Sequence, residues 1–532
     1  MIRATAIAGA LMLLGAAGPA LAQHKEISPY IEISQVVTDN FTTGDVLTYS
    51  QVAAGVDAAV TTHNAAAQVS YRYEHSFSWD DDVGDDDVHQ GLARAAVKVG
   101  QALTIEGGAL ATRARSDIRG DAAGFDGPQV DNVTQVYAFY AGPTLATRAG
   151  PVDLTAMYRF GYVKVEAPGF TGLGPDAPRL DYYDDSTSHT AQVSAGVRPG
   201  AVLPVGLTAS AGYEREDAGQ LDQRYEDKYV RGDVLAPVSP TVALTAGVGY
   251  EELETSQKDA LLDADGNPVV DEDGRFVTDP ASPQRIAYRT DGLYWDAGVV
   301  WRPSSRTSLE AHVGQRYDSW VYFGSLSHAM SETSGFRVVV YDQVDTFGRQ
   351  LRNGLAGLPT SFTTLRDQFS GLYAGCTFGT SGSEVGGCLN DVFQSISTAS
   401  YRARGVDGVV YASHGPTRLG LGAGYANRKL YAPDTSGGAS VFGIEDESVY
   451  GQFFVQQALD ANSSLEGDVF ANWYDPGFPG AENIFSTGAV GTYNRYFGRL
   501  GAIASLGLFT FDTKSTDTDV TGQALVGLRY QF

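Results

Sequence analysis

The sequence predicts an all-β protein: a transmembrane, antiparallel, up-and-down β-barrel of about 20–22 strands, with 22 favoured. Three observations predict it. Apolar and polar residues alternate in one segment after another, short and long connections alternate between those segments, and the chain ends on an apolar, aromatic strand. Successive side chains of a strand point to opposite faces. A closed sheet in lipid needs an apolar outside and a polar inside, and this pattern provides both.

The last strand shows the alternation most clearly. One face of residues 520–532 carries Val520, Gly522, Ala524, Val526, Leu528, Tyr530 and Phe532. The other face is polar or glycine, with Leu525 as the one exception. A soluble edge strand would not normally expose such an apolar face at the chain terminus. A strand that closes a barrel in lipid would do so.

The same period recurs along the chain, for example in residues 66–79, 205–216, 241–252 and 417–428. Short turns rich in Gly, Pro and Arg alternate with longer acidic or Gly-rich loops, as expected for short periplasmic turns and long outer loops. With both chain ends on the periplasmic side, the number of strands should be even. Residues 306–345 decide it: three strands there give 22, whereas one long strand and a loop give 20.

The N-terminus and the charge limit the location and the partners. Residues 1–22 combine a basic start, a short apolar stretch and a small-residue site before Gln23, which predicts a cleaved signal peptide. Residues 23–532 then form a single barrel domain. The net charge of −26 argues against nucleic-acid binding.

The longest segment without clear alternation is residues 346–396. It contains both cysteines of the chain, Cys376 and Cys388, which in an exported protein we expect to form a disulfide. The apolar spacing within 360–373 suggests a short helix. We expect this segment to fold into the lumen as a constriction. The alternative is a loop on the outer surface that the disulfide pins.

Basic residues on the polar face form a second candidate site. The alternation directs seven arginines into the lumen: Arg72, Arg94, Arg159, Arg402, Arg404, Arg418 and Arg428. A ring of charge in a pore sets its selectivity, so these residues predict a preference for anionic solutes or an acidic polymer. The alternative is a set of ion pairs on the inner wall with no selectivity.

No pattern predicts an enzyme, a cofactor or a metal site. The sequence has no G-x-S-x-G, H-E-x-x-H or P-loop motif. Six aspartates in residues 80–87 are expected to form a solvated loop tip, with divalent cations at a lipopolysaccharide surface as the alternative. His75 falls on the lipid-facing side, as the catalytic histidine of an outer-membrane lipase would, but a residue of an interfacial girdle is the simpler interpretation.

The C-terminal residues Leu528, Tyr530 and Phe532 resemble the assembly signal of bacterial outer-membrane β-barrels. Residues 322–328 (YFGSLSH) followed by 336–341 (FRVVVY) look like a strand pair of a family of β-barrel porins associated with exopolysaccharide and PEP-CTERM systems. The resemblance implies the Gram-negative outer membrane, with its lipid and lipopolysaccharide, the barrel assembly machinery and periplasmic polysaccharide export proteins as partners.

Three functions follow as hypotheses. The first is an outer-membrane channel within or beside a polysaccharide export system. The second is a general or anion-preferring diffusion porin. The third, more remote, is a surface enzyme of the lipase type that uses His75.

Overall fold

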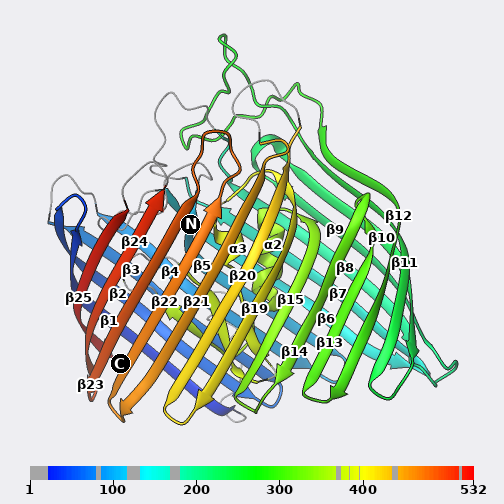
Figure 1. Cartoon of the computed structure of the whole chain (residues 1–532), viewed down its shortest axis with the longest axis horizontal. Helices are drawn as coiled ribbons and strands as arrows, with labels where there is room; N and C mark the ends of the chain where they lie inside the picture. The colour runs from blue at the N-terminus through cyan, green and yellow to red at the C-terminus, as the bar shows by residue number, and fades with distance from the viewer. Residues whose placement is uncertain are drawn as a thin grey trace.

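A ring of 22 antiparallel strands forms the protein (Figure 1). The computed structural model describes residues 22–79, 85–116, 132–167, 180–366, 369, 373–382, 384–394, 396–433, 441–513 and 518–532. Each strand pairs with the next along the chain, except that β15 pairs with β19 across an internal segment. The pairing of β1 with β25, from Tyr30–Gln531 to Asn40–Thr521, closes the ring. The predicted 22-stranded up-and-down barrel is confirmed.

The first half of the ring consists of β1 (Ala22–Asn40), β2 (Val46–Thr62), β3 (Ala65–Ser78), β4 (Asp86–Val99), β5 (Leu103–Arg115), β6 (Val133–Ala149), β7 (Val152–Val165), β8 (Asp185–Val197), β9 (Gly206–Ala218), β10 (Arg224–Pro237) and β11 (Val242–Gln257). The second half consists of β12 (Arg285–Ser304), β13 (Thr307–Arg316), β14 (Ser319–Ala329), β15 (Ser334–Asp345), β19 (Ser400–His414), β20 (Thr417–Tyr431), β21 (Glu445–Asp460), β22 (Ser463–Asp475), β23 (Ile484–Phe497), β24 (Leu500–Thr513) and β25 (Asp519–Gln531).

The remaining elements lie between these strands. A 3-10 turn, η1 (Gln220–Asp222), joins β9 to β10. The segment between β15 and β19 contains α2 (Phe347–Gly357), β16 (Phe362–Arg366), β17 (Tyr373–Ser381), β18 (Glu384–Cys388) and α3 (Asn390–Phe393). None of the helices within the described residues combines the length and the apolar character needed to cross a bilayer.

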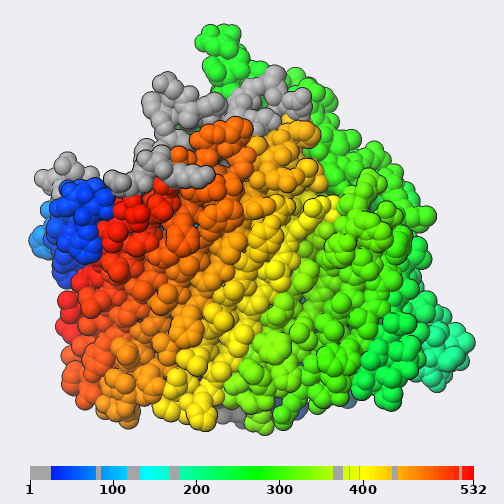
Figure 2. All heavy atoms as spheres, viewed as in Figure 1, coloured from blue at the N-terminus to red at the C-terminus, as the bar shows by residue number. Residues whose placement is uncertain are grey.

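The two faces of the wall differ as the alternation predicts. Outward positions expose large apolar side chains, for example Val526, Leu528 and Tyr530 on β25. Inward positions of neighbouring strands carry buried polar groups such as Glu32 and Arg72. The strands cross the face shown in Figure 2 obliquely, side by side. With its apolar outside and tilted antiparallel strands, the protein is an outer-membrane β-barrel.

Leu525, the apolar residue on the polar face of the last strand, has a partner inside the barrel. It is 2% exposed and packs in a cluster with Val36 of β1, Ile503 and Phe509 of β24, and Phe369 of the internal segment. The break in the alternation therefore marks a place where the inner wall is covered by protein instead of water.

Residues 306–345 form three strands, as the count of 22 requires. The outer turn between β13 and β14 consists only of Tyr317 and Asp318, both with positive φ (57° and 53°), which is the backbone twist of a tight hairpin. The β13–β14 hairpin is therefore much shorter than β12, which has 20 residues.

The predicted signal peptide lies outside the described residues apart from Ala22, as do residues 80–84 of the acidic loop. The connection between β11 and β12 rises highest above the strand ends (green in Figure 1) and folds back onto the outer end of β7. In this connection, Arg275 donates from Nη2 to the Val165 carbonyl at 3.1 Å, and the Phe276 N–H donates to Asp181 Oδ1 at 3.0 Å. Burial raises the pKa of Asp181 to about 7.

The orientation of the wall can be tested on β21. Phe453 is 42% exposed on the outer face near the middle of the strand. Phe453→Arg should destabilise the folded barrel by about 2–4 kcal/mol, because it moves a charge into lipid. Gln456→Arg, on the inner face of the same strand, is the control and should change stability by less than about 1 kcal/mol. Urea unfolding in phospholipid vesicles measures both, and equal effects would contradict the assignment of faces.

The contact between Asp181 and Phe276 predicts that docking of the β11–β12 connection depends on pH. The pKa of Asp181 is about 7 in the folded protein against a normal value of 3.8, so the docked loop binds a proton more tightly than the undocked loop. Docking should be strongest near pH 4 and weaken as the pH rises towards 7. Amide exchange of residues 269–277, corrected for intrinsic rates, should show this loss of protection. Asp181→Asn should flatten the profile, and protection that increases with pH would refute the prediction.

Candidate functional site

The segment between β15 and β19 lies inside the barrel, where it contacts strands around the ring. Arg94 of β4 donates to the Leu358 and Ala356 carbonyls at 3.0 and 3.1 Å. Gln68 of β3 makes two hydrogen bonds to the backbone of Phe362, at 2.7 and 2.9 Å. Figure 1 shows α2 and α3 behind the front strands. These contacts fix the segment across the lumen.

Helix α2 forms because its sequence supplies both a cap and an apolar face. Thr346 is the N-cap, and its hydroxyl accepts from the Arg349 N–H. Phe347, Leu351 and Leu355 recur at the spacing of one helix face and are fully buried. They pack on an apolar part of the inner wall supplied by Leu92, Leu110, Val136 and Val163 of β4 to β7.

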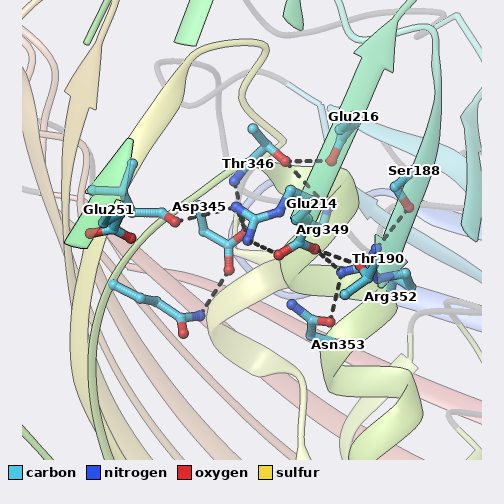
Figure 3. A network of polar contacts seen from close by, with 12 residues as sticks. Ser188, Thr190, Glu214, Glu216, Glu251, Asp345, Thr346, Arg349, Arg352 and Asn353 are labelled. Carbon is cyan, nitrogen blue, oxygen red and sulfur yellow. Dashed lines mark hydrogen bonds and ion pairs between the residues drawn. The ribbon is translucent and has the colours of Figure 1, made fainter. Parts of the chain in front are cut away.

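The opposite face of α2 joins one carboxylate on the wall. Arg349 Nη2 lies 2.7 Å from Glu214 Oε2, and Arg352 forms a second ion pair with the other oxygen of Glu214 (Figure 3). Arg349 also pairs with Asp345 at 3.0 Å, and Arg352 donates to Ser188 at 3.1 Å. All these side chains are buried or nearly so, which makes the network the main polar anchor of the helix.

The wall is shaped to receive these side chains. Gly161 of β7 faces Arg352, and a Cβ at that glycine would lie 2.6 Å from the Arg352 Cδ. Thr190 donates to Glu214 at 2.9 Å, and Thr346 donates to Glu216 at 2.7 Å. The carboxylates of Asp345 and Glu214 outweigh the effect of burial and hold the pKa of Arg349 well above its usual range. Arg349 therefore stays charged in the closed site.

The disulfide lies at the second contact between the segment and the wall. Cys376 of β17 and Cys388 of β18 are bonded and face each other in register. The disulfide packs directly on Gly422 of β20, where a Cβ would clash with the Cys376 sulfur. At Gly420 a Cβ would clash with the Phe454 ring. These inward glycines of β20 leave room for the hairpin, and Phe378 packs on Phe454 beside them.

The short helix suggested within residues 360–373 is wrong for its first part, because Phe362–Arg366 is the strand β16. It pairs with β17 next to the disulfide hairpin, so its backbone hydrogen bonds are used in a sheet. The helices that the structure describes in this segment are α2, which precedes β16, and α3, which follows β18.

A cavity of about 680 Å³ remains beside the segment. Glu26, Arg418 and Asn494 line it near the periplasmic strand ends, and Arg115 and Tyr474 line it near the outer ends. Phe362, Asn390 and Phe393 of the internal segment border it. The cavity is thus lined by residues from both ends of the strands, and the internal segment forms one of its sides.

Five of the seven predicted arginines face the lumen. Arg72 pairs with Glu32 and Glu74 at 2.8 and 2.6 Å, Arg159 pairs with Glu106, and Arg428 pairs with Asp446. Arg94 holds the internal segment, as described above, and Arg418 lines the cavity and contacts Gln456. They do not form one ring, because four of the five are bound to carboxylates or to the backbone of the segment.

Arg402 and Arg404 do not face the lumen, so their predicted orientation is wrong. Their neighbour Tyr401 donates to Gln350 of α2 inside the barrel, which places the even-numbered residues of β19 on the outer face. On that face Arg402 pairs with Asp342 at 2.7 Å, and the Arg404 side chain is 50% exposed. The polarity of the two faces is inverted here because α2 and α3 cover the inside, while charged groups lie on the outside near the outer strand ends.

The residues whose role in anchoring α2 was not predicted from the sequence are Arg349, Arg352 and Glu214. The first two lie in a segment that we treated as an irregular loop, although Thr346 and the spacing of Phe347, Leu351 and Leu355 are a helix signal. Glu214 alternates with apolar residues in β9 and cannot be told from other inward acids in the sequence.

His75, the residue on which the lipase hypothesis depends, lies on the outer face beside Asp85 and Asp87. Its Nδ1 is 2.9 Å from Asp87 Oδ1, and Tyr73 donates to the same oxygen. Among the described residues, no serine hydroxyl is hydrogen-bonded to His75, whereas nucleophilic catalysis requires a nucleophile within reach of its base.

Comparison with known proteins gives similarity of structure only. No protein-family model and no curated protein matches the chain. The FrpB iron transporter from Neisseria meningitidis (F3-3 variant) matches 98% of this chain and 83% of its own, with 12% identity and a TM-score of 0.44. The ferric-catecholate import receptor Fiu from E. coli K12 matches 94% and 81%, with 9% identity and a TM-score of 0.43. The siderophore receptor PiuA from Acinetobacter baumannii matches 94% and 82%, with 7% identity and a TM-score of 0.43. At these values the similarity says nothing of what this chain binds.

The anchor of α2 yields a prediction. Glu214→Gln removes the negative charge that Arg349 and Arg352 share, and breaking a buried ion pair of this kind costs about 3–5 kcal/mol. We expect α2 to leave the wall more often, with higher conductance and faster amide exchange over residues 347–357. Glu226→Gln, which breaks an exposed pair with Lys228 on β10, is the control and should change little. Unchanged exchange in Glu214→Gln would show that the network does not hold the helix.

Proposed function

We propose that the protein is a constricted outer-membrane channel for a hydrated, sugar-containing chain, working within or beside a polysaccharide export system. The observation that carries this proposal is the cavity of about 680 Å³ beside the internal segment, which is lined by residues from both ends of the strands. A path of this kind needs no opening of the wall, and its width is set by how the segment docks.

The lining of the cavity suits sugars. Most of its polar side chains are amides and hydroxyls, among them Gln68, Asn390, Gln456, Asn472 and Thr492. Such groups both donate to and accept from sugar hydroxyls. Tyr474, Tyr496 and Phe393 add aromatic faces along the same path. Many weak polar contacts together with apolar faces hold a neutral chain loosely enough for it to move on.

The charges of the cavity argue against a strong preference for anions. Four acids and four bases line it: Glu26, Asp57, Glu466 and Asp468, and Arg113, Arg115, Arg418 and Arg529. Arg113 pairs with Asp86, and Arg529 pairs with Glu32 at 2.9 Å. A general or anion-preferring diffusion porin is the second candidate function. Arg418 favours it, because this arginine lines the cavity near the periplasmic strand ends and makes only a long hydrogen bond, 3.4 Å, to Gln456.

Planar-bilayer recordings with the full chain distinguish the two candidates. For a sugar channel we expect neutral glucan oligomers to block the current transiently, with a reversal potential near zero in a KCl gradient. Tyr496→Ala should shorten the blocks severalfold, because it removes an aromatic face from the cavity. Tyr493→Ala, on the outer face of the same strand, should leave them unchanged. A marked anion reversal potential without glucan blocks would favour the porin.

The export role has a separate test in cells. Deletion of the gene should leave polymer in the periplasm, and the wild-type chain should restore its release. Unchanged secretion in the deletion strain would remove the export role while leaving the channel itself intact.

A further inference from the structure

The wall of the barrel has a seam where strands overlap instead of pairing. β13 pairs with β12 only as far as Trp295, so the outer part of β12 continues beyond the short β13–β14 hairpin. In the same way β14 pairs with β15 only as far as Gly324 and Val340. Between the outer ends of β12 and β14 on one side and β15 on the other, no ladder of backbone hydrogen bonds joins these strands.

The outer ends of β15, β19 and β20 instead lie on the lumen side of β10 to β14 and pack against their inner faces. Val344 on the outer face of β15 packs with Tyr225, Leu253 and Val321, which are inward residues of β10, β11 and β14. Tyr431 of β20 stacks on Tyr288 of β12, with ring centroids 4.4 Å apart. The outer face of one side of the seam therefore lies against the inner face of the other side.

Side-chain hydrogen bonds and contacts hold the two sides of this seam together. The Ser400 hydroxyl of β19 donates to the Thr255 hydroxyl of β11 at 2.9 Å. Arg402 binds Asp342 and donates to Ser319 Oγ at the tip of the β13–β14 hairpin. From the lumen side, Arg349 of α2 lies 3.6 Å over the Tyr225 ring and donates to the Val344 carbonyl, so it touches both sides. Contacts of this kind break more easily than a strand ladder, because each can open without unzipping the others.

The outer lip of the seam lies at the border between apolar and charged surface. Val340 and Val406 are opposite each other on the outer face of β15 and β19 and are exposed. Arg404, two residues further out than Val406, is 50% exposed and lies 3.7 Å from Asp342. Trp320 and Tyr322 of β14 expose their rings at the hairpin, as aromatic residues do at a lipid headgroup level.

We propose that this seam is a lateral portal through which an anionic amphiphile passes between the lumen and the outer leaflet. Its acidic headgroup would meet Arg404 at the lip, and its acyl chains would stay along the apolar outer face below. Arg402 is already matched by Asp342, whereas Arg404 has only the long contact to the same carboxylate, so it carries the excess positive charge. The portal does not depend on the axial path for sugars.

Photo-crosslinking tests the portal in the full chain. Tyr431→p-benzoylphenylalanine places a photoreactive group inside the seam, and Tyr425→p-benzoylphenylalanine places one on the exposed outer face of the same strand as a control. Each probe is also combined with Thr255→Cys and Ser400→Cys. Oxidation of these two thiols to a disulfide holds the seam closed. Each variant is reconstituted in vesicles of phosphatidylcholine alone, with phosphatidylglycerol, or with lipopolysaccharide, and folding is checked by heat-modifiable migration.

We expect the probe at position 431 to capture phosphatidylglycerol or lipopolysaccharide when the seam is free. Oxidation of the cysteine pair should abolish this capture and leave only a crosslink to β12. The probe at position 425 should capture lipid in both states. The vesicle arms show whether phospholipid or lipopolysaccharide is the occupant.

Three outcomes would overturn the proposal. The first is no lipid on the probe at position 431, and the second is equal capture in the locked and free seam. The third is equal capture from phosphatidylcholine alone together with no effect of Arg404→Glu, which would remove the anionic headgroup from the account.

Discussion

One buried carboxylate, that of Glu214, organises the interior of this barrel. It binds Arg349 and Arg352 of α2 and so fixes the internal segment against β8 and β9. Both arginines are buried, and an unpaired buried charge costs several kcal/mol, so the helix keeps this position as long as the carboxylate is ionised. The width of the axial path and the support behind the seam both depend on where α2 lies.

Both the axial path and the seam depend on the lengths of the strands next to the short β13–β14 hairpin. The two-residue turn at Tyr317–Asp318 makes the β13–β14 hairpin short, so the outer ends of β12 and β15 have no pairing strand on the side that faces this hairpin. The chain then turns inward after β15 into α2, which packs on β5 to β8 and directs Arg349 towards the gap. Arg349 contacts Tyr225 and Val344 there, so a movement of α2 that widens the lumen would also release the seam.

The alternation of apolar and polar residues is sufficient to predict the barrel, a strand number of 20 to 22 and the faces of strands such as β25, because lipid outside and water inside impose a period of two. It fails where protein replaces one of those solvents. Leu525 breaks the rule because Phe369 covers it from inside. Arg402 and Arg404 stand at alternate positions like lumen residues but lie outside, since α2 occupies the lumen next to Tyr401. The cluster around Glu214 joins residues far apart in the sequence, and only the closed ring brings them together.

The position of the internal segment in the lumen is the claim on which the rest depends, and crosslinking in intact cells with a short bifunctional thiol reagent tests it most directly. Gln68→Cys on the inner face of β3 should be joined to Phe362→Cys by this reagent, because the end of the Gln68 side chain lies 2.7 Å from the Phe362 carbonyl. Val69→Cys, on the opposite face of the same strand, should not crosslink with Phe362→Cys. A crosslink in the first pair alone, mapped by mass spectrometry, is the predicted result. If neither pair crosslinks in correctly folded barrels, the segment does not lie in the lumen.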